Sequence, residues 1–299
     1  MPRQRRTRRN QRLVSVSGAA PRSEGLMPSV PLSADQLGDF ARDGFLHVPG
    51  LVPESELAAP DRDSLELIER GVAGPFGDKR WRYQEDVEKG KEHCLYRVND
   101  LAAADMPPSF QVLLAHPRLL AAIHQLVDGD DFAASVHALV FKLPRHGAPA
   151  RWHQDPVKVF RFPVFNVDIY LDDATTNNGC VRAFPGSHLA GHHDPAESPD
   201  FIESWTGGGD EASARRAVAI PAQRGDVIFH ATTLVHGSPW NRSEDLRRTI
   251  YFHIDHRRDV ELAGDRWPQH QFAQAREVTA RAIAMRAERW PEEEPFPYG

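Results

Sequence analysis

Residues 217–254 read AVAIPAQRGDVIFHATTLVHGSPWNRSEDLRRTIYFHI and alternate short apolar runs with turn-forming residues. Three of the runs have the length of β-strands, namely Ala217–Ile220, Asp226–His230 and Arg248–Ile254. His236 ends a further apolar run, and the Gly, Ser, Pro, Asn and Asp residues of 237–245 favour a turn after it. We therefore expect an antiparallel hairpin that brings Arg247 or Arg248 close to His236.

The same pattern extends back to about residue 133, with further strand-like runs at Ser135–Leu143, Val164–Leu171 and Cys180–Phe184. Several short strands at this spacing are typical of an antiparallel sandwich or barrel. Residues 133–256 are therefore predicted to form the β-rich core of the fold. Phe201–Arg216 has no strand pattern and is predicted to be an inserted lid or binding loop.

Helical patterns precede this core. Ser33 has the position of an N-cap for a helix that ends at Gly44. A second helix is predicted after Pro53, interrupted or restarted at Pro60 and ended at Gly71.

One or two further helices are predicted within residues 108–127, so that the N-terminal helices occupy residues 33–127. The intervening residues 74–100 are expected to be irregular. A C-terminal helix with alternating charge is predicted over residues 269–289. The pattern indicates one domain over residues 27–299, which is mainly β with flanking helices.

The composition excludes several classes of protein. The sequence has no run of about 18 apolar residues, which excludes a membrane-spanning chain. Its two cysteines, Cys94 and Cys180, lie far apart, which argues against a disulfide scaffold or a thiolate zinc site and favours a reducing, cytoplasmic setting.

Charge is unevenly distributed along the chain. Residues 1–26 carry seven Arg and one Glu, a net charge of +6. Because the whole chain has a net charge of −6, residues 27–299 carry a net charge of −12. An acidic body argues against nucleic-acid binding by the folded part. The basic segment is predicted to be a disordered tail, and translation from Met27 is an alternative.

Three residues have the chemistry of a metal site. His153 and Asp155 lie two residues apart in RWHQDP, and side chains at this spacing in an extended chain point to the same side. Such a pair is weak evidence by itself. With His236 it completes the set of two His and one carboxylate that holds non-haem Fe(II) and leaves coordination positions open. A nearby Arg suits a carboxylate ligand.

Five ordered segments within residues 33–256 carry a family resemblance: LSADQLGDFARDGFLHVPGLV, WHQD, LDDATTNNGCVRAFPGSH, RGDVIFHATTLVHGS and NRSEDLRR. On these segments the chain resembles the phytanoyl-CoA dioxygenase family of Fe(II)- and 2-oxoglutarate-dependent oxygenases. The resemblance implies a double-stranded β-helix, which is a cupin-like jelly roll.

The resemblance also implies the ligand set. His153, Asp155 and His236 would be the ligands of Fe(II). Arg247, six residues after the Asn of the HGS segment, would bind the distal carboxylate of 2-oxoglutarate. Arg248 is the competing residue, because neighbours on a strand point to opposite faces and only one of the two can face the cavity.

Two further residues are implied at the cosubstrate. The hydroxyl of Ser238 would donate a hydrogen bond to the same carboxylate. Arg97 resembles a position where a basic residue reaches 2-oxoglutarate, and a structural salt bridge is the alternative for it.

The activity that the resemblance implies is hydroxylation of an unactivated C–H bond of a small metabolite, with O2 and 2-oxoglutarate as cosubstrates and succinate and CO2 as products. Retention of Asp155 favours oxygenation over halogenation. Desaturation, epimerisation or ring formation by the same chemistry, a dioxygenase that uses no 2-oxoglutarate, and a non-catalytic metal-binding jelly roll are the alternatives.

Overall fold

The computed structural model describes residues 31–74, 77–84, 94–129, 131–155, 165–264 and 269–298. The predicted basic tail, residues 1–26, lies outside the described residues. Within them, no helix combines the length and apolar character needed to cross a membrane.

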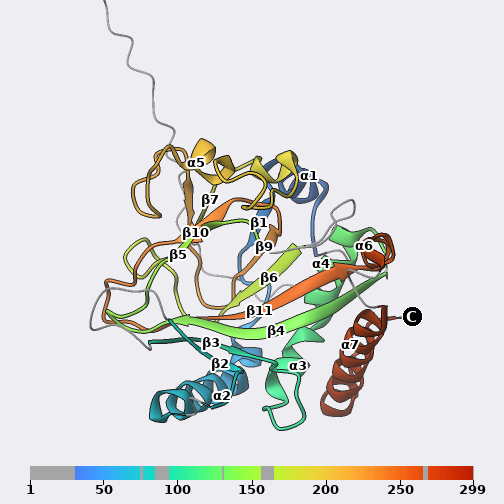
Figure 1. Ribbon diagram of the computed structural model, residues 1–299. Helices are drawn as coiled ribbons and strands as arrows, with labels where there is room; N and C mark the ends of the chain where they lie inside the picture. The colour runs from blue at the N-terminus through green and yellow to red at the C-terminus, as the bar shows by residue number, and fades with distance from the viewer. Residues whose placement is uncertain are drawn as a thin grey trace, which may run out of the picture.

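Two antiparallel sheets form the centre of the structure. The larger contains β1 (Phe45–Val48), β2 (Trp81–Tyr83), β3 (Leu95–Asn99), β4 (Phe132–Lys142), β6 (Phe165–Tyr170), β9 (Val227–Ala231) and β11 (Arg247–His256). Their order is β1-β9-β6-β11-β4-β3-β2. The smaller contains β5 (Ala150–His153), β7 (Val181–Ala183), β8 (Val218–Ile220) and β10 (His236–Ser238), in the order β5-β10-β7-β8. In Figure 1 β5, β7 and β10 lie above β4 and β11.

The helices are α1 (Ala34–Asp43), α2 (Glu54–Ala73), α3 (Ser109–Leu114), α4 (Pro117–Val127), α5 (Phe201–Thr206), α6 (Arg257–Ala263) and α7 (Gln269–Arg289), with a short 3-10 helix at Ser187–Ala190. Helices α2, α3 and α7 lie below β3 and β4 in Figure 1, away from the smaller sheet. Apolar side chains of these helices and of the larger sheet form the main core. Two antiparallel sheets with flanking helices confirm the predicted jelly-roll class.

Helices α1 and α7 match the sequence prediction closely. The Ser33 hydroxyl accepts a hydrogen bond from the Gln36 backbone N–H, and the Gln36 side chain accepts one from the Ser33 N–H, which forms a capping box. Helix α1 ends at Gly44, whose φ of 80° is left-handed. Helix α7 covers the predicted residues 269–289.

The prediction for α2 is wrong at two residues. Pro60 lies inside one continuous helix, where packing of the buried ring offsets the hydrogen bond that proline cannot donate. Gly71 does not end the helix, because α2 continues to Ala73 and Gly74 is the left-handed residue. Gly71 is a close-packing position instead, since a Cβ there would collide with Trp81.

Other differences concern short elements. Strands β2 and β3 lie in the region expected to be irregular, and β10 begins at His236, whereas the sequence predicts a strand that ends there. The predicted hairpin is also wrong, because β10 pairs with β5 and β7 in the smaller sheet and β11 pairs with β4 and β6 in the larger one. In β2 and β3 apolar residues are mixed with charged and aromatic ones, so the sequence shows no clear alternation there.

The inserted segment 201–216 contains α5 and is anchored through its main chain. The Arg182 guanidinium donates hydrogen bonds to the carbonyls of Glu211, Ala214 and Ala217 at 2.6, 3.0 and 3.1 Å. The Trp152 indole donates to the Gly209 carbonyl at 3.1 Å. The segment therefore packs against β5 and β7 through backbone acceptors.

Alternation along β6 and β11 separates two environments. Apolar residues at every second position join the main core, namely Phe165, Val167, Ile169, Ile250, Phe252 and Ile254. The intervening residues point to the opposite face, toward the smaller sheet. They include Asp168, Arg247, Thr249 and Tyr251, which line a cavity.

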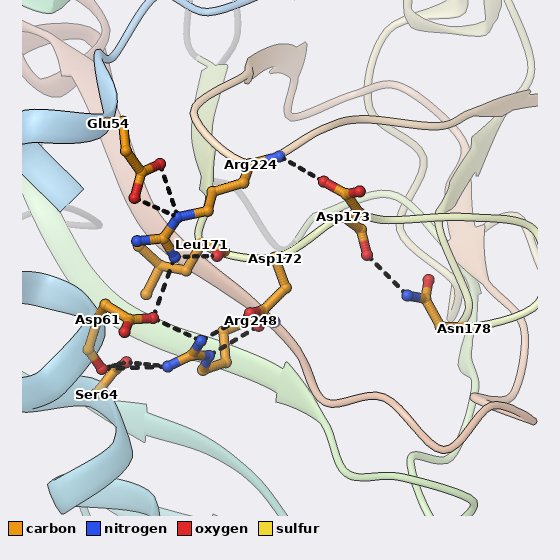
Figure 2. A network of polar contacts seen from close by, with 9 residues as sticks. All are labelled: Glu54, Asp61, Ser64, Leu171, Asp172, Asp173, Asn178, Arg224 and Arg248. Atoms are coloured by element: carbon orange, nitrogen blue, oxygen red, sulfur yellow. Dashed lines mark hydrogen bonds and ion pairs between the residues drawn. The ribbon is translucent and has the colours of Figure 1, made fainter. Parts of the chain in front are cut away.

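Arg248 points to the same face of β11 as the core residues, and its side chain joins β11 to α2 through hydrogen bonds and ion pairs. Its guanidinium bonds both carboxylate oxygens of Asp172, at 2.8 and 2.7 Å, and one carboxylate oxygen of Asp61, at 2.7 Å. It also donates to the Ser64 hydroxyl at 3.0 Å. Figure 2 shows this network, in which Arg224 pairs with the same Asp61. A strand of the sheet is thereby bonded to a helix that is distant in sequence.

We expect Arg248→Ala to lower the free energy of unfolding by about 1–2 kcal/mol, because the partly buried Asp172 would lose its charged partner and Asp61 would keep only Arg224. Chemical denaturation measures this change. Arg42→Ala is the control, since Arg42 pairs with Asp39 and Asp43 on an exposed surface. Equal stabilities of the two variants would show that the Arg248 network does not stabilise the fold.

Candidate active site

The structure brings His153, Asp155 and His236 together. His153 ends β5 and His236 begins β10, and the two residues are paired in register across these strands. Asp155 follows β5, where its backbone N–H donates to the Thr232 carbonyl at 2.8 Å. One ligand atom from each of the three side chains lies within 4.8 Å of the other two. This arrangement can hold one metal ion.

Main-chain acceptors orient both imidazoles. Nδ1 of His153 donates to the Arg151 carbonyl at 2.6 Å, and Nδ1 of His236 donates to the Leu234 carbonyl at 2.9 Å. The Nε2 atoms then face Asp155, at 3.6 Å from Oδ1 for His153 and 3.9 Å from Oδ2 for His236. The strand backbone thus presents both Nε2 lone pairs to the same point.

The protonation states of His236 and Asp155 suit metal binding, whereas burial lowers the pKa of His153 but Asp155 outweighs it and raises that pKa. Burial, reinforced by the neighbouring His153, lowers the pKa of His236 to about 3, so this ring is neutral. Burial by itself would raise the pKa of Asp155, but His236 and His153 outweigh it and hold the pKa of this carboxyl well below its usual range. A neutral imidazole and a carboxylate are the forms that bind a metal.

Asn166 on β6 fixes the orientation of Asp155. Its amide Nδ2 donates to Asp155 Oδ2 at 2.6 Å. Its Oδ1 accepts from the Tyr251 hydroxyl at 2.8 Å and from His253 Nδ1 at 2.7 Å. The amide is therefore held on both sides. No motif in the sequence points to Asn166, because a single amide in a strand has no local signature.

His230 on β9 is a further imidazole beside the cluster. Its Nε2 lies 3.6 Å from Asp155 Oδ2, and its Nδ1 lies 3.1 Å from Asp168 Oδ2. His230 also receives a hydrogen bond from the Asn166 amide, at 2.9 Å. Both ring nitrogens of His230 thus face side chains of the protein. This favours a role of His230 in orienting these side chains over a role as a metal ligand.

A cavity of about 790 Å³ opens between the sheets at this cluster. The predicted cosubstrate residues Arg97, Ser238 and Arg247 line it together with the three candidate ligands. The cavity therefore contains every site residue predicted from the sequence.

Arg247 and Arg248 differ sharply in their surroundings. Arg247 is 4% exposed and faces the cavity, where its guanidinium donates to the Gly179 carbonyl at 3.2 Å and approaches the Thr249 hydroxyl at 3.5 Å. Its Nε has no hydrogen-bond partner. Arg248 faces α2 and is bonded to carboxylates. Of the two, Arg247 is the one available to an anionic ligand.

Ser238 and Arg97 lie on opposite sheets. Ser238 is buried on β10. Arg97 on β3 donates to Asn99 Oδ1 at 2.6 Å and lies 5.0 Å above the Tyr251 ring. Across the described part of the chain, Arg97 forms no salt bridge, so the structural alternative for this residue is not observed.

The cavity wall also contains charged residues that the sequence pattern does not predict, among them Lys142 and Glu211. Lys142 ends β4 and is 5% exposed, and Glu211 belongs to the inserted segment. Glu211 Oε1 accepts a hydrogen bond from the Trp152 backbone N–H at 3.1 Å. Lone charged residues in a strand and a loop carry no sequence signal of a site.

Comparison with known proteins gives consistent results. The family model described as "Phytanoyl-CoA dioxygenase (PhyH)" matches residues 40–249. The Mus musculus protein "Phytanoyl-CoA dioxygenase domain-containing protein 1" is 26% identical over 278 residues, covering 79% of this chain and 92% of the relative.

Two solved structures are also similar. AviO1 from Streptomyces viridochromogenes Tue57 is 31% identical with a TM-score of 0.62, covering 76% of this chain and 96% of AviO1. EvdMO1 is 30% identical with a TM-score of 0.61, and this chain covers about half (49%) of its length, with 74% of this chain aligned. The match to the family model extends over more than half of the sequence, and the chain belongs to the phytanoyl-CoA dioxygenase family of Fe(II)- and 2-oxoglutarate-dependent oxygenases.

Proposed function

We propose that the protein hydroxylates an unactivated C–H bond of a small metabolite, with Fe(II), 2-oxoglutarate and O2, and releases succinate and CO2. One observation carries this proposal: a cluster of two His and one Asp shares a single cavity with a buried Arg whose Nε has no partner. The cluster suits Fe(II), and the Arg suits the distal carboxylate of a dicarboxylic cosubstrate.

The protein groups would bind and orient the reactants. His153, Asp155 and His236 would hold Fe(II), and Arg247 with Ser238 would bind the distal carboxylate of 2-oxoglutarate. The chemistry supplied by these bound groups is oxidation of a C–H bond, coupled to the release of succinate and CO2. Because the residues lie on paired strands, the fold fixes their distances before any ligand binds.

The whole cavity would hold both 2-oxoglutarate and a small substrate. Its volume of about 790 Å³ is in the range of small-molecule sites. Aromatic side chains contribute to its wall, among them Tyr83, Tyr96, Trp240 and Tyr251. These side chains provide apolar surface in the cavity wall.

The first test is formation of the metal-to-ligand charge-transfer band when Fe(II) and 2-oxoglutarate are added anaerobically. We expect the band in the unchanged protein and its loss in His153→Ala and Asp155→Ala, because each removes a ligand. Optical titration measures it, and circular dichroism checks that each variant is folded. A folded, unchanged protein without the band would contradict the proposed function.

A second test addresses 2-oxoglutarate. We expect Arg247→Ala to raise the Kd of the cosubstrate about 10-fold to 100-fold, because a charge-assisted hydrogen bond is lost. Calorimetry of the Fe(II)-loaded protein measures this change, and Arg42→Ala is the remote control. Unaltered affinity and succinate formation in Arg247→Ala would rule out this anchor and favour another carboxylate-binding residue.

A third test concerns Asn166. We expect Asn166→Ala to weaken Co(II) binding about 10-fold to 100-fold, because Asp155 loses the amide that orients it. Gln125→Ala is a matched control, since its amide makes two hydrogen bonds with the backbone of Leu32 on another part of the fold. Equal Co(II) affinities of the two variants would mean that Asp155 needs no such support.

A further inference from the structure

Lys142 is a buried cation in the cavity wall. Its side chain is 5% exposed, and its ammonium donates a hydrogen bond to the Ala148 carbonyl at 2.5 Å. Throughout the described residues, no carboxylate lies within ion-pair distance of Lys142. A buried charged group without an opposite charge is costly, so a buried lysine normally pairs with an anion or loses its proton.

A second cation lies directly beside it. Lys142 and Arg247 are cross-strand partners in the register of β4 and β11, and both line the cavity. The acceptors of Arg247 are a carbonyl and a hydroxyl, which bring no negative charge. Burial first, and the charge of Arg247 second, lower the pKa of Lys142 well below its usual range. Two like charges at opposed positions destabilise a sheet unless an anion lies between them.

Gly179 holds the lysine chain in place. A Cβ on Gly179 would lie 2.9 Å from Lys142 Cδ and 3.0 Å from Cε, so the backbone there packs against the aliphatic chain. The carbonyl of the same residue accepts the hydrogen bond from Arg247. Gly179 therefore contacts both cations and fixes them side by side.

Glu211 does not supply the missing negative charge. It raises the pKa of Lys142 through space, after the larger effects of burial and Arg247. Its Oε1 is bonded to the backbone of Trp152, and it forms no ion pair with Lys142. Arg248 provides the contrast, since Asp172 and Asp61 neutralise that buried arginine.

We propose that Lys142 is a second anchor for 2-oxoglutarate, whose distal carboxylate it binds together with Arg247. The inference rests on the proposed function. A carboxylate has two oxygens and one negative charge, and the adjacent ammonium and guanidinium offer one donor group to each oxygen. Binding of the cosubstrate would supply the charge that this pair of cations lacks.

The test compares two ligands on the Fe(II)-loaded protein under anaerobic conditions. 2-Oxoglutarate carries the distal carboxylate, and 2-oxopentanoate has the same chain without it. We expect Lys142→Met to raise the Kd of 2-oxoglutarate about 10-fold to 100-fold and to leave the Kd of 2-oxopentanoate unchanged. Lys79→Met is the matched control, because Lys79 is exposed and does not line the cavity.

Lys142→Gln separates charge from hydrogen bonding, since its amide can still donate to the Ala148 carbonyl. We expect the same selective loss of 2-oxoglutarate affinity in this variant, which also serves if Lys142→Met fails to fold. Equal weakening of both ligands, or unchanged 2-oxoglutarate affinity, would overturn the role of Lys142. The charge-transfer band of the unchanged protein tests the proposed function separately, so the two failures are distinguishable.

Discussion

Strand β11 lies between β6 and β4 and separates the main core from the cavity. Successive side chains of a strand point to opposite faces, so Ile250, Phe252 and Ile254 enter the main core while Thr249 and Tyr251 line the cavity. The same alternation places Arg247 in the cavity and the adjacent Arg248 beside α2. The cavity wall and the contacts with α2 take their positions from this strand, and the candidate metal cluster lies on the smaller sheet.

Charge balance differs on the two faces. On the helix side, Arg248 is neutralised by carboxylates from α2 and from the loop after β6. On the cavity side, Lys142 donates to the Ala148 carbonyl and Arg247 donates to the Gly179 carbonyl, and both of these acceptors are neutral. Arg248 therefore has the environment of a structural residue. Lys142 and Arg247 have no counter-charge, which is the environment expected of the anion site proposed above.

Much of this organisation is predictable from sequence because it has local causes. The capping box at Ser33 acts over a few residues, and the spacing of His153 and Asp155 follows strand periodicity. The turn expected from Gly237 onward is wrong at its start, because Gly237 lies inside β10 and pairs with Arg182 of β7. Lys142 and Asn166 have no such signal, because their roles depend on strands that pair across the sheet. Gly71 is misleading for the same reason: the indole that requires its small size lies on another element.

The anchoring of segment 201–216 has a consequence for how this protein can diverge. Arg182 bonds two backbone carbonyls of the segment and that of Ala217 directly after it, and every residue type offers the same carbonyl. Substitutions in the segment therefore leave these attachments intact while they change the side chains beside the cavity. The candidate metal cluster, in contrast, uses side-chain atoms, so a substitution there removes a donor atom. Substrate preference and oxidative chemistry can thus evolve at different rates within one chain.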